Sequence, residues 1–264
     1  GKLRPRMALN RSLEPVIAYG STNAINVSKW NGSTFVTPQN VLPAGMQTYI
    51  SGWTGPDCAS GGDTILVVFK SMPLDAGHVY AVRSTDGGQS FSDTIRVDNH
   101  QGGIAWMPSV DVDDNGDVLV SYMIHDANWS NPRYVLAKST DAGLTYTSEI
   151  SVITSIPGET CDCCPSEVIK KGNRELLLFR NNDANTRDIH GVLSLDNGGS
   201  FPYQENVDNS NWNIAACPST GPHGVFEGNN LITTYASSAS GNSRIYISVF
   251  TIKQRRLNRK DLQR

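Results

Sequence analysis

Apolar and polar residues alternate over short stretches along most of the chain, a pattern typical of β-strands. Four strongly apolar heptapeptides each follow a turn rich in Gly, Asn or Asp: TILVVFK (64–70), DVLVSYM (117–123), RELLLFR (174–180) and NLITTYA (230–236). A second stretch with alternating apolar and polar residues follows each of them, as in HVYAVRS (78–84). Helical periodicity with capping residues is absent outside the basic C-terminal segment. We therefore expect an all-β protein.

One octapeptide recurs at constant spacing. It reads STDGGQSF at 84–91, STDAGLTY at 139–146 and SLDNGGSF at 194–201, so each copy begins 55 residues after the previous one. SKWNGSTF at 28–35 keeps most of the pattern but has Trp30 at the aspartate position. A period of this length predicts a solenoid or a propeller.

Five units are visible, because a proline followed by a small or polar residue recurs at Pro5, Pro56, Pro108, Pro165 and Pro218. Four strands fit in each unit, which is the size of a propeller blade. The predicted fold is a β-propeller of four-stranded antiparallel blades within residues 1–252. The approximate blades are 3–42, 54–98, 106–153, 163–207 and 216–252, followed by a basic tail at 253–264. The fifth unit lacks a fourth strand in this interpretation. Closure by a longer six-bladed chain, by the tail or by another subunit stays open.

The repeated octapeptide is best explained as a turn. Its aspartate accepts backbone N–H bonds, its glycine takes a positive φ, its hydroxyls satisfy further loop groups, and its aromatic residue anchors the turn in the blade core. Equivalent turns on separate blades cannot converge on one substrate, which argues against catalysis by these aspartates. The structural positions are Ser84, Asp86, Gly88, Phe91, Ser139, Asp141, Gly143, Tyr146, Ser194, Asp196, Gly198 and Phe201.

These octapeptides resemble Asp boxes, the BNR repeats of the sialidase-like (neuraminidase) β-propeller superfamily, and the resemblance covers residues from about 3 to 252. The segment that begins with CDCCPSEV at 161–168 also resembles uncharacterised secreted bacterial sialidase-like proteins. The resemblance implies sialidase activity, another glycosidase activity or non-catalytic glycan binding. It also implies that the Asp boxes lie on the face opposite the functional one.

The loops expected on that opposite face carry four of the five tryptophans. They predict a concave cup suited to sugars, because aromatic faces stack on sugar rings while amides and carboxylates bond to hydroxyls. The alternative is that the tryptophans pack between blades. The predicted substrate-binding residues are Trp53, Trp106, His125, Asp126, Trp129, Asn181, Asn182, Asp183 and Trp212.

The sialidase resemblance also implies catalytic residues. Sialidases hold the substrate carboxylate with three arginines and use an aspartate as acid/base. The carboxylate-binding candidates here are Arg4, Arg6, Arg180 and Arg187, and the acid/base candidate is Asp57 at the start of an inner strand. The structural alternatives are an ion pair for Arg187 and a strand-end position for Arg180.

Three of the five cysteines lie in CDCC at 161–164. Cys217 precedes a proline as Cys164 does, and equivalent positions lie close around a propeller axis, so we expect a disulfide between Cys217 and this loop. The disulfide candidates are Cys161, Cys163, Cys164 and Cys217. A thiolate metal site made by Cys161, Cys164 and Cys217 is the weaker alternative, since only one C-x-x-C is present. No metal and no cofactor are expected.

Charge narrows the function classes further. The chain has 264 residues, and residues 1–252 carry 16 basic and 24 acidic side chains, a balance of −8. An acidic body argues against nucleic-acid binding, and no apolar run is long enough for a membrane span. The composition suits a secreted or cell-surface protein. We expect an extracellular sialidase-like protein that hydrolyses a glycan or glycoconjugate as an exo-glycosidase. The alternative is a non-catalytic carbohydrate-binding or surface-assembly module.

Overall fold

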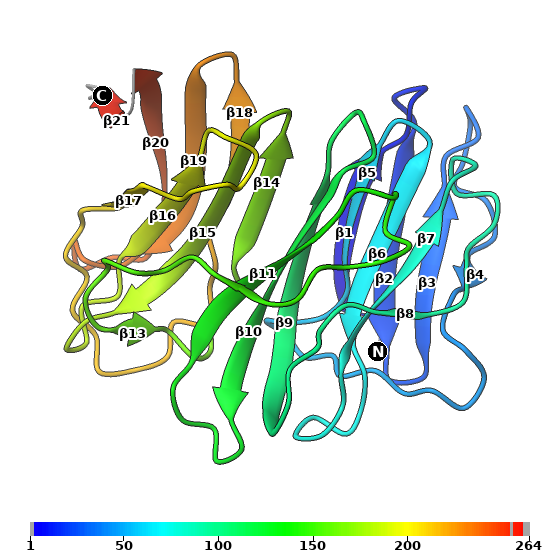
Figure 1. Ribbon diagram of the computed structural model, residues 1–264, viewed down its shortest axis with the longest axis horizontal. Helices are drawn as coiled ribbons and strands as arrows, with labels where there is room; N and C mark the ends of the chain where they lie inside the picture. The colour runs from blue at the N-terminus through cyan, green and yellow to red at the C-terminus, as the bar shows by residue number, and fades with distance from the viewer. Residues whose placement is uncertain (1–2, 254–255, 261–264) are drawn as a thin grey trace.

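The computed structural model describes residues 3–253 and 256–260, with side chains up to residue 252. Its strands form five antiparallel sheets, each made from consecutive segments of the chain (Figure 1). The first sheet contains β1 (Leu3–Leu9), β2 (Pro15–Ser21), β3 (Ala24–Lys29) and β4 (Gln39–Asn40). The second contains β5 (Asp57–Gly61), β6 (Thr64–Lys70), β7 (Val79–Ser84) and β8 (Ile95–Arg96).

The remaining sheets follow the same plan. The third contains β9 (Gly103–Val112), β10 (Val118–Asp126), β11 (Arg133–Ser139) and β12 (Ile150–Ser151). The fourth contains β14 (Glu167–Lys171), β15 (Arg174–Asn182), β16 (Ile189–Ser194) and β17 (Tyr203–Asn206), and the short β13 (Glu159–Thr160) pairs with the far end of β15. The fifth contains β18 (His223–Glu227), β19 (Asn230–Ser237), β20 (Arg244–Lys253) and β21 (Arg256–Lys260). The described residues form no helix, and so none that could cross a membrane.

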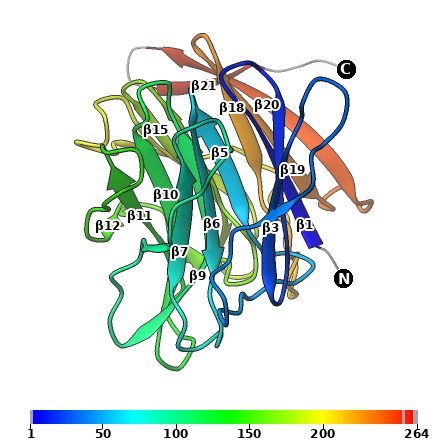
Figure 2. The same ribbon diagram turned by 90° about the vertical axis from the view of Figure 1, so that its right-hand side faces the viewer.

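The five sheets stand side by side in chain order around one axis (Figures 1 and 2). The innermost strands are β1, β5, β9, β14 and β18, and each contacts the next from β1 to β18. All five line one central cavity. The fold is therefore a β-propeller of four-stranded antiparallel blades, as the repeat predicts.

The core lies between neighbouring sheets. Leu66 and Val68 pack against the third sheet while Val67 and Phe69 pack against the first, and all four side chains are fully buried. Both faces of an inner sheet are covered, which explains why its second strand is continuously apolar rather than alternating.

The first and fifth sheets differ from the three between them, because one face of each is exposed. Apolar side chains protrude from β1 at Met7 (65% exposed) and Leu9 (49%), and from the fifth sheet at Val225 (54%), Ile245 (73%) and Ile247 (54%). The propeller is thus not closed between these two sheets by the residues that the structure describes.

Two sequence predictions about the fifth unit need correction. Strand β21 comes from the segment assigned to a basic tail, and it pairs with β20, so the sheet does have a fourth strand. Backbone groups alone make such pairing, so an Asp box is not required for it. The innermost strand also begins directly after Pro222 rather than near Pro218. His223 therefore occupies the post-proline position that Arg6 and Asp57 occupy in their own strands.

The Asp boxes form the predicted turns. In the second copy, the Ser139 hydroxyl donates to Asp141 (2.7 Å) and accepts from the Gly143 N–H (2.9 Å), while Thr145 donates to the other carboxylate oxygen (2.6 Å). Gly143 has a φ of 80°, and Tyr146 packs against the core. These bonds, the one from Thr145 foremost, lower the pKa of Asp141 to about 2. Both carboxylate oxygens of Asp141 thus accept hydrogen bonds within their own turn.

Candidate functional site

A central cavity of about 450 Å³ runs between the five innermost strands. Each of these strands contributes one side chain to its lining that is a carboxyl group, an imidazole or a guanidinium. The five residues are Arg6 of β1, Asp57 of β5, Asp111 of β9, Glu167 of β14 and His223 of β18. Residues far apart in the sequence therefore meet on the propeller axis, which is the arrangement that a single substrate requires.

Asp57 is held from two sides. Arg6 Nε lies 3.2 Å from Asp57 Oδ1, and the Val110 N–H donates to Asp57 Oδ2 at 3.1 Å. The second bond joins the second blade to the third, so it fixes the carboxylate relative to the neighbouring strand. Asp57 is buried with only 8% of its surface exposed, and it faces the cavity.

Asp111 is the most perturbed carboxyl group of the cavity. Burial raises its pKa to about 7, although the N–H groups of Lys170 and Val112 donate to it at 2.7 and 2.9 Å. The negative charges of Glu167 and Asp57 act in the same direction as burial. Near neutral pH this carboxyl group therefore exists in both its protonated and its ionised form, as a general acid requires.

Glu167 and His223 form a pair beside it. His223 Nδ1 lies 2.8 Å from Glu167 Oε1, and this hydrogen bond raises the pKa of His223. Burial raises the pKa of Glu167. The cavity thus combines three carboxyl groups, one imidazole and one guanidinium, which is a set suited to proton transfer next to a negatively charged or polar ligand.

A second cavity of about 420 Å³, called the side groove below, opens beside the central one and shares Arg6 and His223 with it. Arg4 also lines this groove. The β1 register shifts between Leu3 and Arg6, and Arg4 has a φ of 55°, so a local irregularity of the strand directs this side chain. A Cβ on Gly55 would lie 2.8 Å from Arg4 Cβ, so only glycine leaves room for the arginine.

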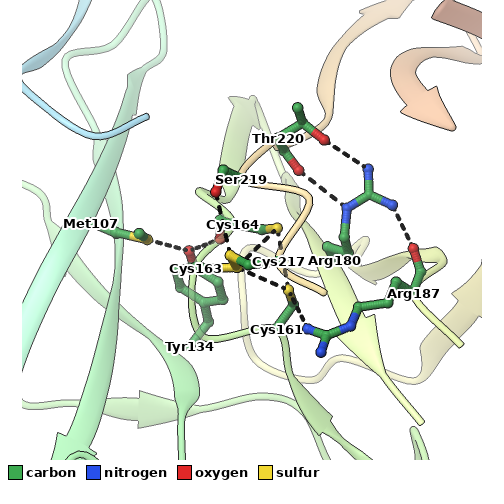
Figure 3. The surroundings of a disulfide bond; sticks show 10 residues. All are labelled: Met107, Tyr134, Cys161, Cys163, Cys164, Arg180, Arg187, Cys217, Ser219 and Thr220. Atoms are coloured by element: carbon green, nitrogen blue, oxygen red, sulfur yellow. Dashed lines mark hydrogen bonds between the residues drawn. A yellow bond between two sulfur atoms is a disulfide. The ribbon is translucent and has the colours of Figure 1, made fainter. Parts of the chain in front are cut away.

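Arg180 and Arg187 line neither of the two cavities. They lie beside Thr220 and Cys161 instead (Figure 3). Arg180 is fully buried; its guanidinium donates to the carbonyls of Thr220 (3.1 Å), Ala236 (2.9 Å) and Arg187, and it lies over the Trp212 ring at 5.2 Å. Arg187 Nη1 lies 2.9 Å from Cys161 Sγ. With only Arg4 and Arg6 at the cavities, the four predicted residues do not form a three-arginine site. The physical reason is that buried guanidiniums must satisfy their donors internally.

The tryptophans do not form one cup either. Trp212 is buried under Arg180, and Trp106 packs edge to face on Trp129 at 5.4 Å, with His125 also in contact. Trp53, exposed by 37%, lies outside both cavities, as do the other three. Trp106 belongs to the core between the third and fourth sheets, which agrees with packing between blades, and Trp212 packs against Arg180. Burial of an indole stabilises the fold strongly.

The other predicted substrate-binding residues serve local bonds. His125 Nδ1 lies 3.2 Å from the Trp129 carbonyl, and burial lowers its pKa. Asn181 donates to the Pro157 carbonyl and Asn182 to Glu159. Asp126 accepts from Asn131 and Arg133, and the backbone of Asp183 pairs with Thr186. None of these residues lines the central cavity or the side groove.

Asp111, Glu167 and His223 were missed by the sequence analysis. A signal existed: with Asp57 they form a series of titratable residues 54, 56 and 56 residues apart. These residues form no repeated motif, because the residue type changes from one blade to the next. His223 is not among the predicted site residues, because the sequence places the fifth innermost strand near Pro218 rather than at His223–Glu227.

The fold and the central cavity together define a β-propeller with titratable side chains converging on its axis, and similar folds occur among solved structures. One is a protein of unknown function from Dyadobacter fermentans, with 16% identity over 94% of this chain and 78% of that chain and a TM-score of 0.60. Another is an ulvan lyase of polysaccharide lyase family 25, with 11% identity and a TM-score of 0.61. That alignment covers 98% of this chain and 66% of the lyase, so this chain spans about two thirds of its length.

A third similar structure is an α-L-arabinanase from Penicillium chrysogenum, with 13% identity over 96% of this chain and 94% of that chain and a TM-score of 0.57. These carbohydrate-active neighbours are a lyase and an arabinanase rather than sialidases. No protein-family model matches the sequence, and no curated protein matches it. At such low identity the similarity establishes the propeller fold and nothing finer.

Proposed function

We propose that this protein is a glycan-cleaving enzyme, a glycoside hydrolase, whose active site is the central cavity. The observation that carries the proposal is the convergence of Asp57, Asp111 and Glu167 from three innermost strands, with the pKa of Asp111 near 7. Glycoside hydrolysis uses one protonated carboxyl group and one carboxylate on either side of the scissile bond. The carbohydrate-active propellers with the same fold support this substrate class by analogy.

The residues take distinct roles in this proposal. Asp111 donates its proton to the glycosidic oxygen, and Asp57 supplies the carboxylate that activates water or attacks the anomeric carbon. This differs from the sialidase pattern, in which Asp57 would be the acid. Glu167 and His223 hold a further proton beside them.

Arg4 and Arg6 favour an acidic sugar as the substrate. Both line the side groove next to the central cavity, and guanidinium groups bind carboxylates in a fork-shaped geometry. A uronate or a sialate carries such a carboxylate, so the sialidase activity implied by the Asp boxes remains within the proposal.

We also propose an extracytoplasmic location, which the Cys163–Cys217 disulfide supports.

The test is turnover of a panel of aryl glycosides, sialosides, arabinans and uronate-containing polysaccharides. New reducing ends without an unsaturated product would support hydrolysis, whereas an unsaturated uronate product would identify a lyase. Binding by folded protein without turnover of any substrate would overturn the enzyme proposal and favour the alternative, a non-catalytic carbohydrate-binding module.

Replacement of Arg6 tests the acidic substrate. Arg6→Gln removes the cation shared by both cavities, and we expect KM for an acidic glycan to rise about 10- to 100-fold, as for loss of a charged hydrogen bond. KM for a neutral aryl glycoside should stay nearly unchanged and serves as the control. An equal rise for both substrates would contradict recognition of a carboxylate by Arg6.

A further inference from the structure

Four of the five cysteines gather where two loops meet beside the fourth sheet (Figure 3). Cys161, Cys163 and Cys164 lie between β13 and β14, and Cys217 lies in the segment before β18. Cys163 and Cys217 form a disulfide, the bond predicted between Cys217 and the CDCC loop. Cys161 and Cys164 are free thiols whose Sγ atoms lie 3.2 Å apart.

Cys161 is placed to react with the disulfide. Cys161 Sγ lies 3.7 Å from Cys163 Sγ, and Arg187 Nη1 lies 2.9 Å from Cys161 Sγ. The hydrogen bond with Cys164 and the positive charge of Arg187 lower the pKa of Cys161, whereas the pKa of Cys164 is raised. The thiolate of the pair is therefore favoured at Cys161, and a thiolate is the attacking species in thiol–disulfide exchange.

We propose that these four cysteines form an internal thiol–disulfide exchange centre with two alternative pairings. The Cys161 thiolate attacks Cys163 Sγ, which forms a Cys161–Cys163 bond and expels Cys217 as a thiolate. Cys164 then attacks Cys161 Sγ, which forms a Cys161–Cys164 disulfide and releases Cys163. In the first step the negative charge passes from Cys161 to Cys217, and in the second step the thiol proton of Cys164 passes to Cys163. One disulfide is exchanged for another, so no external oxidant or reductant is consumed.

A metal site uses the same sulfurs less well. The Sγ atoms of Cys161, Cys163 and Cys164 lie within 4.8 Å of one another. Cys163 is already bound to Cys217, however, and a disulfide sulfur is not a thiolate ligand. Two thiols beside a cation are a poor metal site but a suitable exchange pair.

The exchange would change the anchoring of the side groove. Ser219, Thr220 and Pro222 follow Cys217 and line one part of this groove, and Pro165 and Ser166 follow Cys164 and line another. The Cys163–Cys217 bond ties these two segments together. After exchange, the polar contacts of Arg180 with Thr220 would still hold the first segment, without the covalent link. The centre is thus a switch for the wall of the groove, and it stands independently of the glycan proposal.

The test uses the accessibility of Cys217, which is exposed whereas Cys161 and Cys164 are buried. The folded protein is incubated with iodoacetamide and no reductant, then unfolded, treated with a heavier alkylating reagent and analysed by peptide mass spectrometry. We expect Cys217 to be alkylated progressively while a Cys161–Cys164 disulfide accumulates. Glycan turnover plays no part in this measurement, so its failure is distinct from failure of the proposed function.

Cys161→Ser should abolish alkylation of Cys217, because the attacking sulfur is gone. Cys58→Ala is the matched control, since Cys58 is a buried free cysteine in a different sheet, and it should behave like the parent protein. Cys164→Ser keeps the test decisive if Cys161→Ser does not fold. In that variant Cys217 should still be alkylated, with Cys161 bound to Cys163. Unmodified Cys217 in the parent protein, or equal alkylation in Cys161→Ser, would overturn the proposal.

Discussion

Two sets of carboxyl groups in this propeller behave in opposite ways. Asp86, Asp141 and Asp196 of the Asp boxes are bonded to hydroxyls of their own turns, and these bonds lower their pKa values, that of Asp196 to about 2. Asp111 and Glu167 line the central cavity, where burial raises their pKa values. The side chains are chemically alike, and only their surroundings differ.

The comparison shows why repetition and function separate in this fold. Each Asp box solves the same local problem, so the same residues recur in each copy. The innermost strands instead face one another around the axis, and a site there needs unlike groups. They present Arg6, Asp57, Asp111, Glu167 and His223 to the central cavity. The repeated aspartates mark the architecture, whereas the divergent ones carry the candidate chemistry.

The largest expected effect comes from replacing one aspartate of each set. Asp111→Asn should lower kcat about 10²- to 10⁴-fold, because the proposed general acid is lost. Asp141→Asn should change kcat by no more than about threefold, because its turn lies away from the cavity. Steady-state kinetics on the best substrate of the panel, with circular dichroism to confirm folding, measures both. Equal losses in the two variants would remove the distinction between the sets.

The pH dependence should also separate them. Activity should fall about tenfold per pH unit above pH 7, as Asp111 ionises and can no longer donate. A raised folded-state pKa means that the native state binds the proton more tightly than the unfolded state. The contribution of Asp111 to stability is therefore present in acid and is lost as the pH rises from about 4 to about 7.

The stability contribution of an Asp-box aspartate depends on pH in the opposite direction. The pKa of Asp141 is depressed to about 2, so its contribution is present above about pH 4 and is lost as the pH falls towards 2. The free energy of unfolding of Asp111→Asn and Asp141→Asn is measured by denaturant unfolding across this pH range. Relative to the parent protein, Asp111→Asn should lose less stability as the pH rises from about 4 to about 7, and Asp141→Asn should lose less stability as the pH falls from about 4 to about 2. A smaller loss over the same pH interval in both variants would contradict the assignment.

A smaller effect is expected within one Asp box. Ser194 is fully buried, and its hydroxyl accepts from the Gly198 N–H at 2.9 Å, so Ser194→Ala should cost about 1–3 kcal/mol of unfolding free energy. The Ser200 hydroxyl donates to Asp196 from an exposed position, so Ser200→Ala should cost less than about 1 kcal/mol of unfolding free energy. Urea unfolding of both variants checks this order. A larger loss in Ser200→Ala would show that the exposed bond dominates the turn.

The smallest effect is expected at Trp129. It is 38% exposed, contacts Trp106 edge to face and lies outside both cavities. Trp129→Ala should therefore destabilise the fold by about 1 kcal/mol and leave kcat/KM within about threefold. A loss of kcat/KM beyond tenfold at unchanged stability would restore the tryptophan cup that the loops predict.

Local and periodic features were accessible from the sequence. The 55-residue step predicted the propeller, the octapeptide predicted its turns, and the position of Cys217 predicted its bond to the CDCC loop, which falls on Cys163. Each depends on chain geometry that repeats or on residues at equivalent positions. The fourth strand of the fifth sheet escaped because backbone pairing carries no side-chain motif.

The sequence by itself determined the all-β propeller and the structural role of the Asp boxes, because strand periodicity and turn chemistry are set by neighbouring residues. Only the tertiary structure decided which polar side chains meet. In the folded chain Arg180 is buried, and Asp111, Glu167 and His223 lie together at the central cavity. Cys161 lies close to the Cys163–Cys217 disulfide. Burial and approach between distant segments depend on how whole sheets pack, and no local pattern records that.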